Sequence, residues 1–341
     1  MPPSKTVKQR KVWDALKFGI NFLTEKGISQ PRLNSETLLA HVIGTERFAL
    51  YVDGEELLKP WQWNLYQRLL QRRGEFVPLQ YLLGSVNFFG FDFVVDKRVL
   101  IPRPETEILV ERTLLKIKNF PAKVKILDLG TGCGNIALSL AKLTKAEIYA
   151  IDISKNSLAV ARKNSQQLKL KKRVHFLRGD CFKPLKKKRV LFHLICSSPP
   201  YLPTEQLRKS SEEINFEPEI ALNGGEDGLD FFRRIIKESP PFLTKDGYLI
   251  LEMGDHQSKA IKDLVKKNKF LSLESVVPDY QGIERIAVIK KYNHEFIEFS
   301  ELRILTGLTG LKHNKNVVDE LARLSTKVDY YNSRVDSATT K

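Results

Sequence analysis

Cysteine is scarce in this chain of 341 residues, which contains only Cys133, Cys181 and Cys196. A small and odd number of cysteines argues against a disulfide framework and favours a reducing compartment. No cysteines and histidines are grouped at the spacing of a zinc site, so we expect no metal. Apolar runs are short as well, and none approaches the roughly 18 residues of a membrane-spanning helix. Trp13 and Asp14 interrupt any apolar core of a secretory signal. These absences predict a cytoplasmic globular protein, and the length of 341 residues predicts about two domains.

Acidic residues are outnumbered, because 40 Asp and Glu stand against 56 Lys and Arg, which gives a net charge of +16. Such an excess is typical of proteins that work near RNA or the ribosome, and it equally suits a lysine-rich, well-solvated surface. The excess is concentrated between Lys163 and Arg189, where Asp180 is the only acidic residue. For this basic stretch we favour a solvated surface, with an RNA- or ribosome-facing surface as the alternative.

Residues 1–76 have the pattern of a small helical bundle with almost no strand signal. Apolar residues over 12–23 recur at helical spacing. A second helix is expected to begin at Ser35 after Asn34 as its N-cap, and a third covers 61–72. The sequence therefore predicts an N-terminal helical domain.

The next segment, residues 77–105, changes character. Aromatic and β-branched residues surround Gly90 within 86–95, a pattern that predicts a β-hairpin. We expect this segment to link two domains. At the other end of the chain, residues 293–341 form an extension with a polar end and no assigned role.

Residues 106–292 alternate between short apolar strands and amphipathic helices. This alternation predicts a doubly wound α/β domain with a mostly parallel sheet. The expected strands cover residues 124–129, 147–153, 174–177, 192–196, 248–253 and 286–289, and the expected helices cover 136–143 and 157–168.

A glycine-rich segment follows the first of these strands and opens a helix. Glycines allow close approach of the backbone to a ligand, and a helix N-terminus supplies free N–H groups. Such a loop suits a nucleotide, a dinucleotide or S-adenosylmethionine. The chain has no Gly-Lys-[Ser/Thr] loop, so a phosphate-binding loop is less favoured. Its residues are Asp128, Gly130, Thr131, Gly132, Cys133 and Gly134.

Acidic residues end the next two strands, at the same edge of the predicted sheet. Asp152 can accept hydrogen bonds from both ribose hydroxyls of an adenosine ligand. Asp180, followed by Cys181, can accept one from the exocyclic amine of an adenine. With the glycine loop, this set resembles a class I S-adenosylmethionine-dependent methyltransferase.

The fourth strand ends in Ser198-Pro199-Pro200-Tyr201. This segment is similar to the [Asn/Asp/Ser]-Pro-Pro-[Tyr/Phe] motif of methyltransferases that act on planar nitrogens. The lone pair of such a nitrogen is delocalised, so the nitrogen must be held in place for attack. Ser198 and the Pro199 carbonyl can accept its two N–H bonds, the prolines stiffen the loop, and the Tyr201 ring can pack on the flat amide.

Further segments resemble the peptide-chain release factor glutamine methyltransferase (HemK/PrmC) family over residues 12–291. They are Pro78 to Gly84, Leu100 to Glu107 with its Pro102-Arg103-Pro104-Glu105 core, Glu217 to Asp230, and Gln281 to Arg285. The resemblance implies a Rossmann-like methyltransferase domain that methylates N5 of the glutamine in the Gly-Gly-Gln loop of release factors. It also implies that the N-terminal helical domain docks the release factor. We expect the protein to be a monomer.

Site residues follow from the same resemblance. S-adenosylmethionine would contact Asp128, Gly130, Thr131, Gly132, Cys133, Gly134, Asp152, Asp180, Cys181 and Ser198. The glutamine and its loop would contact Ser198, Pro199, Pro200, Tyr201, Pro102, Arg103, Pro104 and Glu105, of which Ser198 to Tyr201 are the catalytic set.

Two positions depart from the family pattern. The family has Asn where this chain has Ser198, and a serine hydroxyl accepts a hydrogen bond only if its own proton is donated elsewhere. Cys181 replaces a large apolar residue that packs on the adenine in relatives. Two alternatives follow: a nucleic-acid amino methyltransferase acting on cytosine-N4 or adenine-N6, or a release-factor-binding protein with impaired catalysis.

Overall fold

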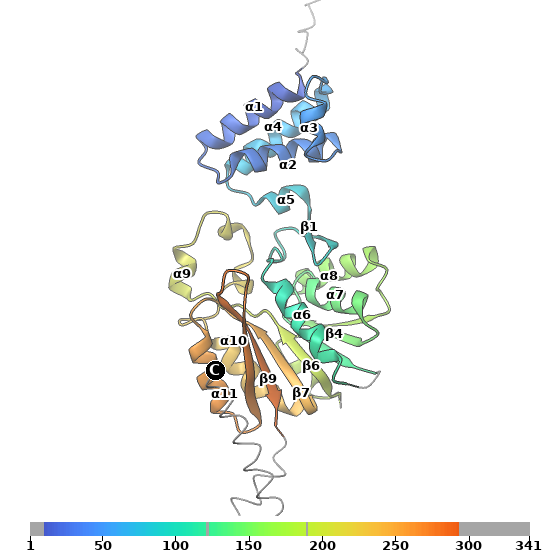
Figure 1. Cartoon of the computed structure of the whole chain (residues 1–341), viewed down its shortest axis with the longest axis vertical. Coiled ribbons are helices and arrows are strands. Elements are labelled where there is room, and N and C mark those ends of the chain that lie inside the picture. The colour runs from blue at the N-terminus through green and yellow to red at the C-terminus, as the bar shows by residue number, and fades with distance from the viewer. Residues whose placement is uncertain (1–9, 121–122, 189, 293–341) are drawn as a thin grey trace, which may run out of the picture. The chain divides into compact units, whose positions relative to one another are not determined.

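The computed structural model describes residues 10–120, 123–188 and 190–292. Four helices come first: α1 (Val12–Glu25), α2 (Pro31–Ile43), α3 (Ala49–Val52) and α4 (Pro60–Gly74). Figure 1 shows them as a compact group. Their shared apolar core includes Leu16, Leu23, Leu38 and Leu70, so the predicted helical bundle is present.

The predicted N-cap of the second helix is wrong. α2 begins at Pro31, because proline is favoured in the first turn, where its missing N–H costs nothing. Asn34 therefore lies inside the helix. Its amide donates to the carbonyls of Ser29 and Gln30, both at 3.0 Å, and its oxygen accepts from Arg73 Nε at 2.7 Å.

The segment after the bundle contains a short helix, α5 (Leu79–Leu83), and the predicted hairpin of β1 (Ser85–Phe88) and β2 (Phe91–Val94). The two strands pair antiparallel. Leu82 packs into the core of the helical bundle, whereas Phe88 and Phe93 pack into the core of the domain that follows.

A seven-stranded sheet in the order β5-β4-β3-β6-β7-β9-β8 forms the centre of that domain. Its first five strands are parallel; β9 pairs antiparallel with β7, and the edge strand β8 pairs antiparallel with β9. The strands are β3 (Lys125–Leu129), β4 (Glu147–Asp152), β5 (Val174–Arg178), β6 (Phe192–Ser197), β7 (Leu243–Glu252), β8 (Leu271–Pro278) and β9 (Glu284–Lys291).

Helices cover both faces of the sheet (Figure 1). One face packs against α6 and α7 through a core that includes Leu109 and Leu138, and the other against α10 and α11 through Phe232 and Ile261. The doubly wound α/β prediction is confirmed, although the sequence analysis did not identify β8. The helices are α6 (Thr106–Ile117), α7 (Asn135–Leu143), α8 (Lys155–Gln167), α9 (Thr204–Arg208), α10 (Asp230–Glu238) and α11 (Ser258–Lys266), with 3₁₀ turns at Lys183–Leu185, Ile214–Phe216, Glu219–Ala221 and Pro240–Phe242.

Among the residues that the structure describes, no helix has the length and apolar character needed to cross a membrane. The predicted extension at 293–341 lies outside the described residues.

Candidate active site

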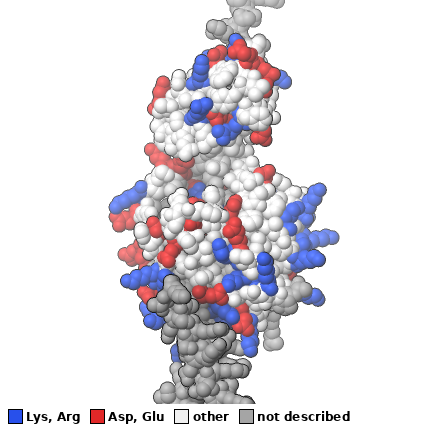
Figure 2. Space-filling model, in the orientation of Figure 1, with Lys and Arg blue, Asp and Glu red and all other residues white. Residues whose placement is uncertain are grey.

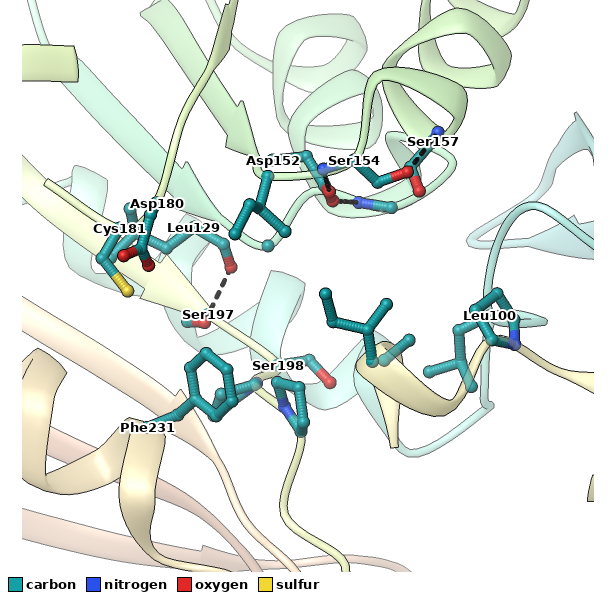
Figure 3. Close-up of a pocket in the computed structure, with 18 of the residues that line it drawn as sticks. Leu100, Leu129, Asp152, Ser154, Ser157, Asp180, Cys181, Ser197, Ser198 and Phe231 are labelled. Atoms are coloured by element: carbon teal, nitrogen blue, oxygen red, sulfur yellow. Dashed lines mark hydrogen bonds between the residues drawn. The ribbon is translucent and has the colours of Figure 1, made fainter. Parts of the chain in front are cut away.

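The sheet topology creates a crevice beside the carboxyl ends of β3 and β6. The chain winds from β3 through β4 to β5 in one direction and continues from β6 to β7 in the other, and ligands bind at such a reversal. A cavity of about 310 Å³ opens there (Figure 3). The predicted site residues that line it are Gly130, Gly132, Asp152, Asp180, Cys181, Ser198, Pro199 and Pro200.

The glycine loop forms one wall of this cavity. Gly130 and Gly132 have φ of +73° and +55°, and a Cβ at either position would meet no atom within 4 Å. The space beside this backbone is therefore open to a ligand. Gly134 differs, because its Cβ would lie 3.0 Å from Leu138 and 3.3 Å from Ala161. This third glycine allows α7 and α8 to pack closely.

Asp152 joins the glycine loop to the end of β4. Its two carboxylate oxygens accept hydrogen bonds from the backbone N–H of Gly132 and of Ser154, both at 2.8 Å (Figure 3). Burial raises the pKa of this carboxyl group, and the two N–H donors counteract the rise. Each oxygen keeps a free lone pair, because a carboxylate has about four acceptor positions.

Asp128, Thr131 and Cys133 lie behind the loop rather than on the cavity wall. Each is at most 2% exposed. Thr131 Oγ1 donates to Asp128 Oδ2 at 2.7 Å, and the other oxygen of Asp128 makes no hydrogen bond. Burial raises the pKa of Asp128 to about 7, against the hydrogen bond from Thr131.

We expect an Asp128→Asn variant to be more stable than the unaltered protein at high pH, by roughly 2–4 kcal/mol at pH 8. In the unfolded chain this carboxyl titrates near pH 4, so between about pH 4 and pH 7 the folded state binds more protons. The stability of the unaltered protein therefore falls relative to the variant as pH rises through this window. Urea unfolding at pH 5.5 and pH 8 tests this, and an equal difference at both pH values would contradict it.

Asp180 lies on the cavity wall as part of an ion-pair cluster. Its carboxylate pairs with Arg234 of α10 and with Lys183, each at 2.8 Å. These two cations lower the pKa of Asp180 to about 2. The neighbouring Cys181 has a φ of +47°, and burial raises the pKa of its thiol to about 11, so the thiol is neutral. The carboxylate therefore stays ionised beside a neutral, polarisable sulfur.

The Ser-Pro-Pro-Tyr segment forms the opposite wall. Ser198 and Pro200 are half-buried, and Pro199 is buried. Tyr201 lies beyond the cavity lining, where burial raises the pKa of its phenol.

The backbone of Tyr201 is held from two sides. Gln257 donates to its carbonyl at 2.9 Å. A Cβ on Gly224 would lie 2.8 Å from the Tyr201 Cα, and the following residue, Leu202, exchanges hydrogen bonds with Leu222 and Gly224. The segment at 222–228 thus fixes where the Ser-Pro-Pro-Tyr loop leaves the sheet.

The Pro102-Arg103-Pro104-Glu105 segment lies outside the cavity lining. Glu217 anchors it: the buried carboxylate of Glu217 accepts from the Ile101 N–H at 2.9 Å and pairs with Arg103. The charges of Arg103 and Glu105 act on Tyr201, which places this segment near the tyrosine. Two stretches that are far apart in the sequence therefore meet beside the Ser-Pro-Pro-Tyr segment.

Several cavity-lining residues were missed by the sequence analysis. Phe231 and Arg234 come from α10, a helix that the sequence analysis left unassigned, and Arg98 and Leu100 precede the proline-rich segment. Ser157 of α8 donates to the Arg98 carbonyl at 3.0 Å and so holds that segment beside the cavity. One sequence signal could have indicated Arg234: it lies four residues after Asp230, which ends the segment Glu217 to Asp230 that resembles the family.

The basic stretch lies mostly on exposed surface. Figure 2 shows basic side chains gathered near the helices that cover one face of the sheet. Arg173 donates to the Thr144 carbonyl at 2.8 Å and Lys183 pairs with Asp180, so part of the stretch has structural contacts. Within residues 10–120, 123–188 and 190–292, no cluster of three His, Cys, Asp or Glu side chains could hold a metal ion.

Both the helical part and the α/β part of the chain match known proteins. Residues 14–84 match a family model described as the PrmC N-terminal domain, and residues 121–301 match one described as a methyltransferase domain. The release factor glutamine methyltransferase of Geobacter sulfurreducens is 38% identical over 279 residues, covering 81% of this chain and 94% of that protein. The protein of the same name from Moorella thermoacetica is 39% identical over 272 residues, covering 80% and 95%.

Proposed function

Because this chain belongs to the release factor glutamine methyltransferase family, we propose that it methylates N5 of the glutamine in the Gly-Gly-Gln loop of peptide-chain release factors. The observation that carries this proposal is one cavity with the glycine loop on one wall and the Ser-Pro-Pro-Tyr segment on the other. A methyl donor on the first wall would face an amide acceptor on the second. Methylation of the loop would modulate translation termination.

S-adenosylmethionine is the methyl donor that a class I methyltransferase domain implies, and the cavity suits it. When bound, it supplies an electrophilic methyl group on a sulfonium. Gly130 and Gly132 offer open backbone, and Asp152 has free lone pairs for ribose hydroxyls. Asp180 and Cys181 would contact the adenine, while Asp128, Thr131, Cys133 and Gly134 would hold the loop from behind.

The acceptor amide would be held by Ser198 and by the Pro199 carbonyl. A planar amide nitrogen is a weak nucleophile, so orientation and removal from water are the contributions that this chain can make. Tyr201 packs behind the loop, and Pro102 to Glu105 extend the surface toward the release-factor loop.

The helical domain at residues 1–76 would dock the release factor, with 77–105 as its link to the methyltransferase domain at 106–292. Exposed apolar side chains support a docking role: Phe48 is 71% exposed, Val52 78% and Trp61 56%. Phe48 and Val52 are four residues apart at α3, and exposed apolar side chains mark an interaction surface where they form a contiguous patch. We further propose a cytoplasmic monomer whose basic stretch, Lys163 to Arg189, is a solvated surface, with a surface facing the ribosome or RNA as the alternative.

The test is transfer of a labelled methyl group to purified release factor, beside a release factor whose Gly-Gly-Gln loop carries Gln→Ala. We expect label on the intact factor and none on the variant. Label on nucleic acid instead would favour the amino methyltransferase alternative, which matches over both domains make less favoured. Tight binding of both ligands without transfer would mean that Ser198 has impaired the reaction.

A further inference from the structure

A buried carboxyl group lies directly behind the Ser-Pro-Pro-Tyr segment. Glu252 ends β7, is 2% exposed, and is not part of the cavity lining. β6 and β7 are parallel neighbours in which Ser197 pairs with Leu251. Ser198 directly follows the end of β6 and Glu252 directly follows Leu251, so the two residues lie side by side and their side chains interact.

The surroundings of Glu252 do not satisfy the hydrogen-bonding capacity of its buried carboxyl group. One carboxylate oxygen, Oε2, is buried and makes no hydrogen bond. Burial raises the pKa of the carboxyl group, and the hydroxyls of Thr106 and Ser198 act against the rise. Glu105 and Arg285 are the charged side chains that also act on it, and Arg285 is itself paired with Asp279. A buried oxygen without a partner costs stability, so its presence requires another explanation.

Ser198 supplies that explanation. A hydroxyl has one proton and two lone pairs, so it accepts a hydrogen bond from an amide N–H only when its proton points at another acceptor. Ser198 lies on the cavity wall with Glu252 behind it. A proton donated to the Glu252 carboxylate, with which the Ser198 hydroxyl interacts, leaves the serine lone pairs free for a group in the cavity.

We propose that Glu252 is a positioning residue that accepts the Ser198 hydroxyl proton and thereby turns the serine into an acceptor for the substrate amide. The inference rests on the proposed function. It explains how serine serves at a position where an asparagine would bring its own carbonyl. No bond is made or broken at Glu252, which acts only through the orientation of Ser198.

The test compares Glu252→Met, which keeps side-chain length and removes both oxygens, with Glu252→Gln, which keeps one carbonyl acceptor. Methyl transfer to release factor should fall about 10-fold or more in kcat for the Met variant, the effect of one well-placed hydrogen bond, and less for Gln. The affinities for S-adenosylmethionine and release factor, measured by titration calorimetry, should stay within about 2-fold. Glu147→Met, at the amino end of β4 in the same sheet and outside the cavity lining, serves as the control.

Two further readouts separate positioning from a structural role. In a Ser198→Ala background, Glu252→Met should have almost no further effect on kcat, because both changes remove the same interaction. The urea concentration at which the Met variant unfolds should change little, because loss of the hydrogen bond to Ser198 is offset by removal of the buried, unpaired Oε2. The inference is overturned if Ser198→Ala and Glu252→Met lower kcat independently, so that their fold-losses multiply in the double variant. It is also overturned if Glu252→Met clearly loses stability or keeps full activity. Absence of transfer by the unaltered enzyme would overturn the proposed function, and this inference with it.

Discussion

The Asp152→Ala variant should bind S-adenosylmethionine at least about 100-fold more weakly than the unaltered protein. The change removes a carboxylate that both holds the Gly132 and Ser154 N–H groups and offers lone pairs to ribose hydroxyls. Hydrogen bonds to a charged acceptor contribute about 1.5–3 kcal/mol each, so the loss of two accounts for this factor or more. Titration calorimetry with S-adenosylmethionine measures the effect.

A matched control lies on the same strand. Glu147→Ala removes a carboxylate from the amino end of β4, away from the cavity, and should leave cofactor affinity unchanged. Asp152→Asn, which retains one carbonyl oxygen, should fall between the two. If Asp152→Ala keeps its folded circular dichroism spectrum and binds S-adenosylmethionine normally, the assignment of this cavity to the cofactor is wrong.

The second large effect is expected for Gly224→Ala, a change that adds one methyl group outside the cavity lining. The new Cβ would lie 2.8 Å from both the Tyr201 Cα and the Gly228 carbonyl oxygen. Both are backbone atoms, so the Ser-Pro-Pro-Tyr loop must shift. A displacement near 1 Å at reacting groups costs on the order of 100-fold in rate, and we expect kcat for methyl transfer to fall by that factor.

Cofactor binding distinguishes this mechanism from general damage. The glycine loop and Asp152 do not contact Gly224, so affinity for S-adenosylmethionine should change by less than about 3-fold. Gly27→Ala provides the control for the backbone, because Gly27 has a φ of +70° and its Cβ would meet nothing within 4 Å. That variant should lose some stability and keep its kcat; equal losses of kcat in both would contradict the proposed clash.

Local signals in the sequence predicted which residues lie at this edge of the sheet. The glycine loop and Ser198 follow a short apolar strand, Asp152 ends one, and strand ends of a parallel sheet meet at one edge. Order along the chain was therefore enough to bring them together. The N-cap at Asn34 failed because Pro31, three residues earlier, is a stronger start signal.

Other features depended on contacts between distant segments. β8 lies at the edge of the sheet, and its mixed polar and apolar residues give a weak pattern. Arg234 reaches Asp180 across 54 positions of sequence, and Glu217 reaches Ile101 across 116. Such pairs depend on how helices and loops pack on the sheet, which no local spacing encodes.

The sequence alone determined the α/β class, the helical N-terminal domain, the order of the strands that carry the glycine loop and Asp152, and the Ser-Pro-Pro-Tyr segment. Only the tertiary structure decided which of those residues face the cavity and which, like Asp128 and Cys133, lie behind it. It alone placed Glu252 beside Ser198, because that neighbour follows from the register of β6 on β7. The physical reason is that burial and register are set by long-range packing, whereas spacing along the chain records only local conformation.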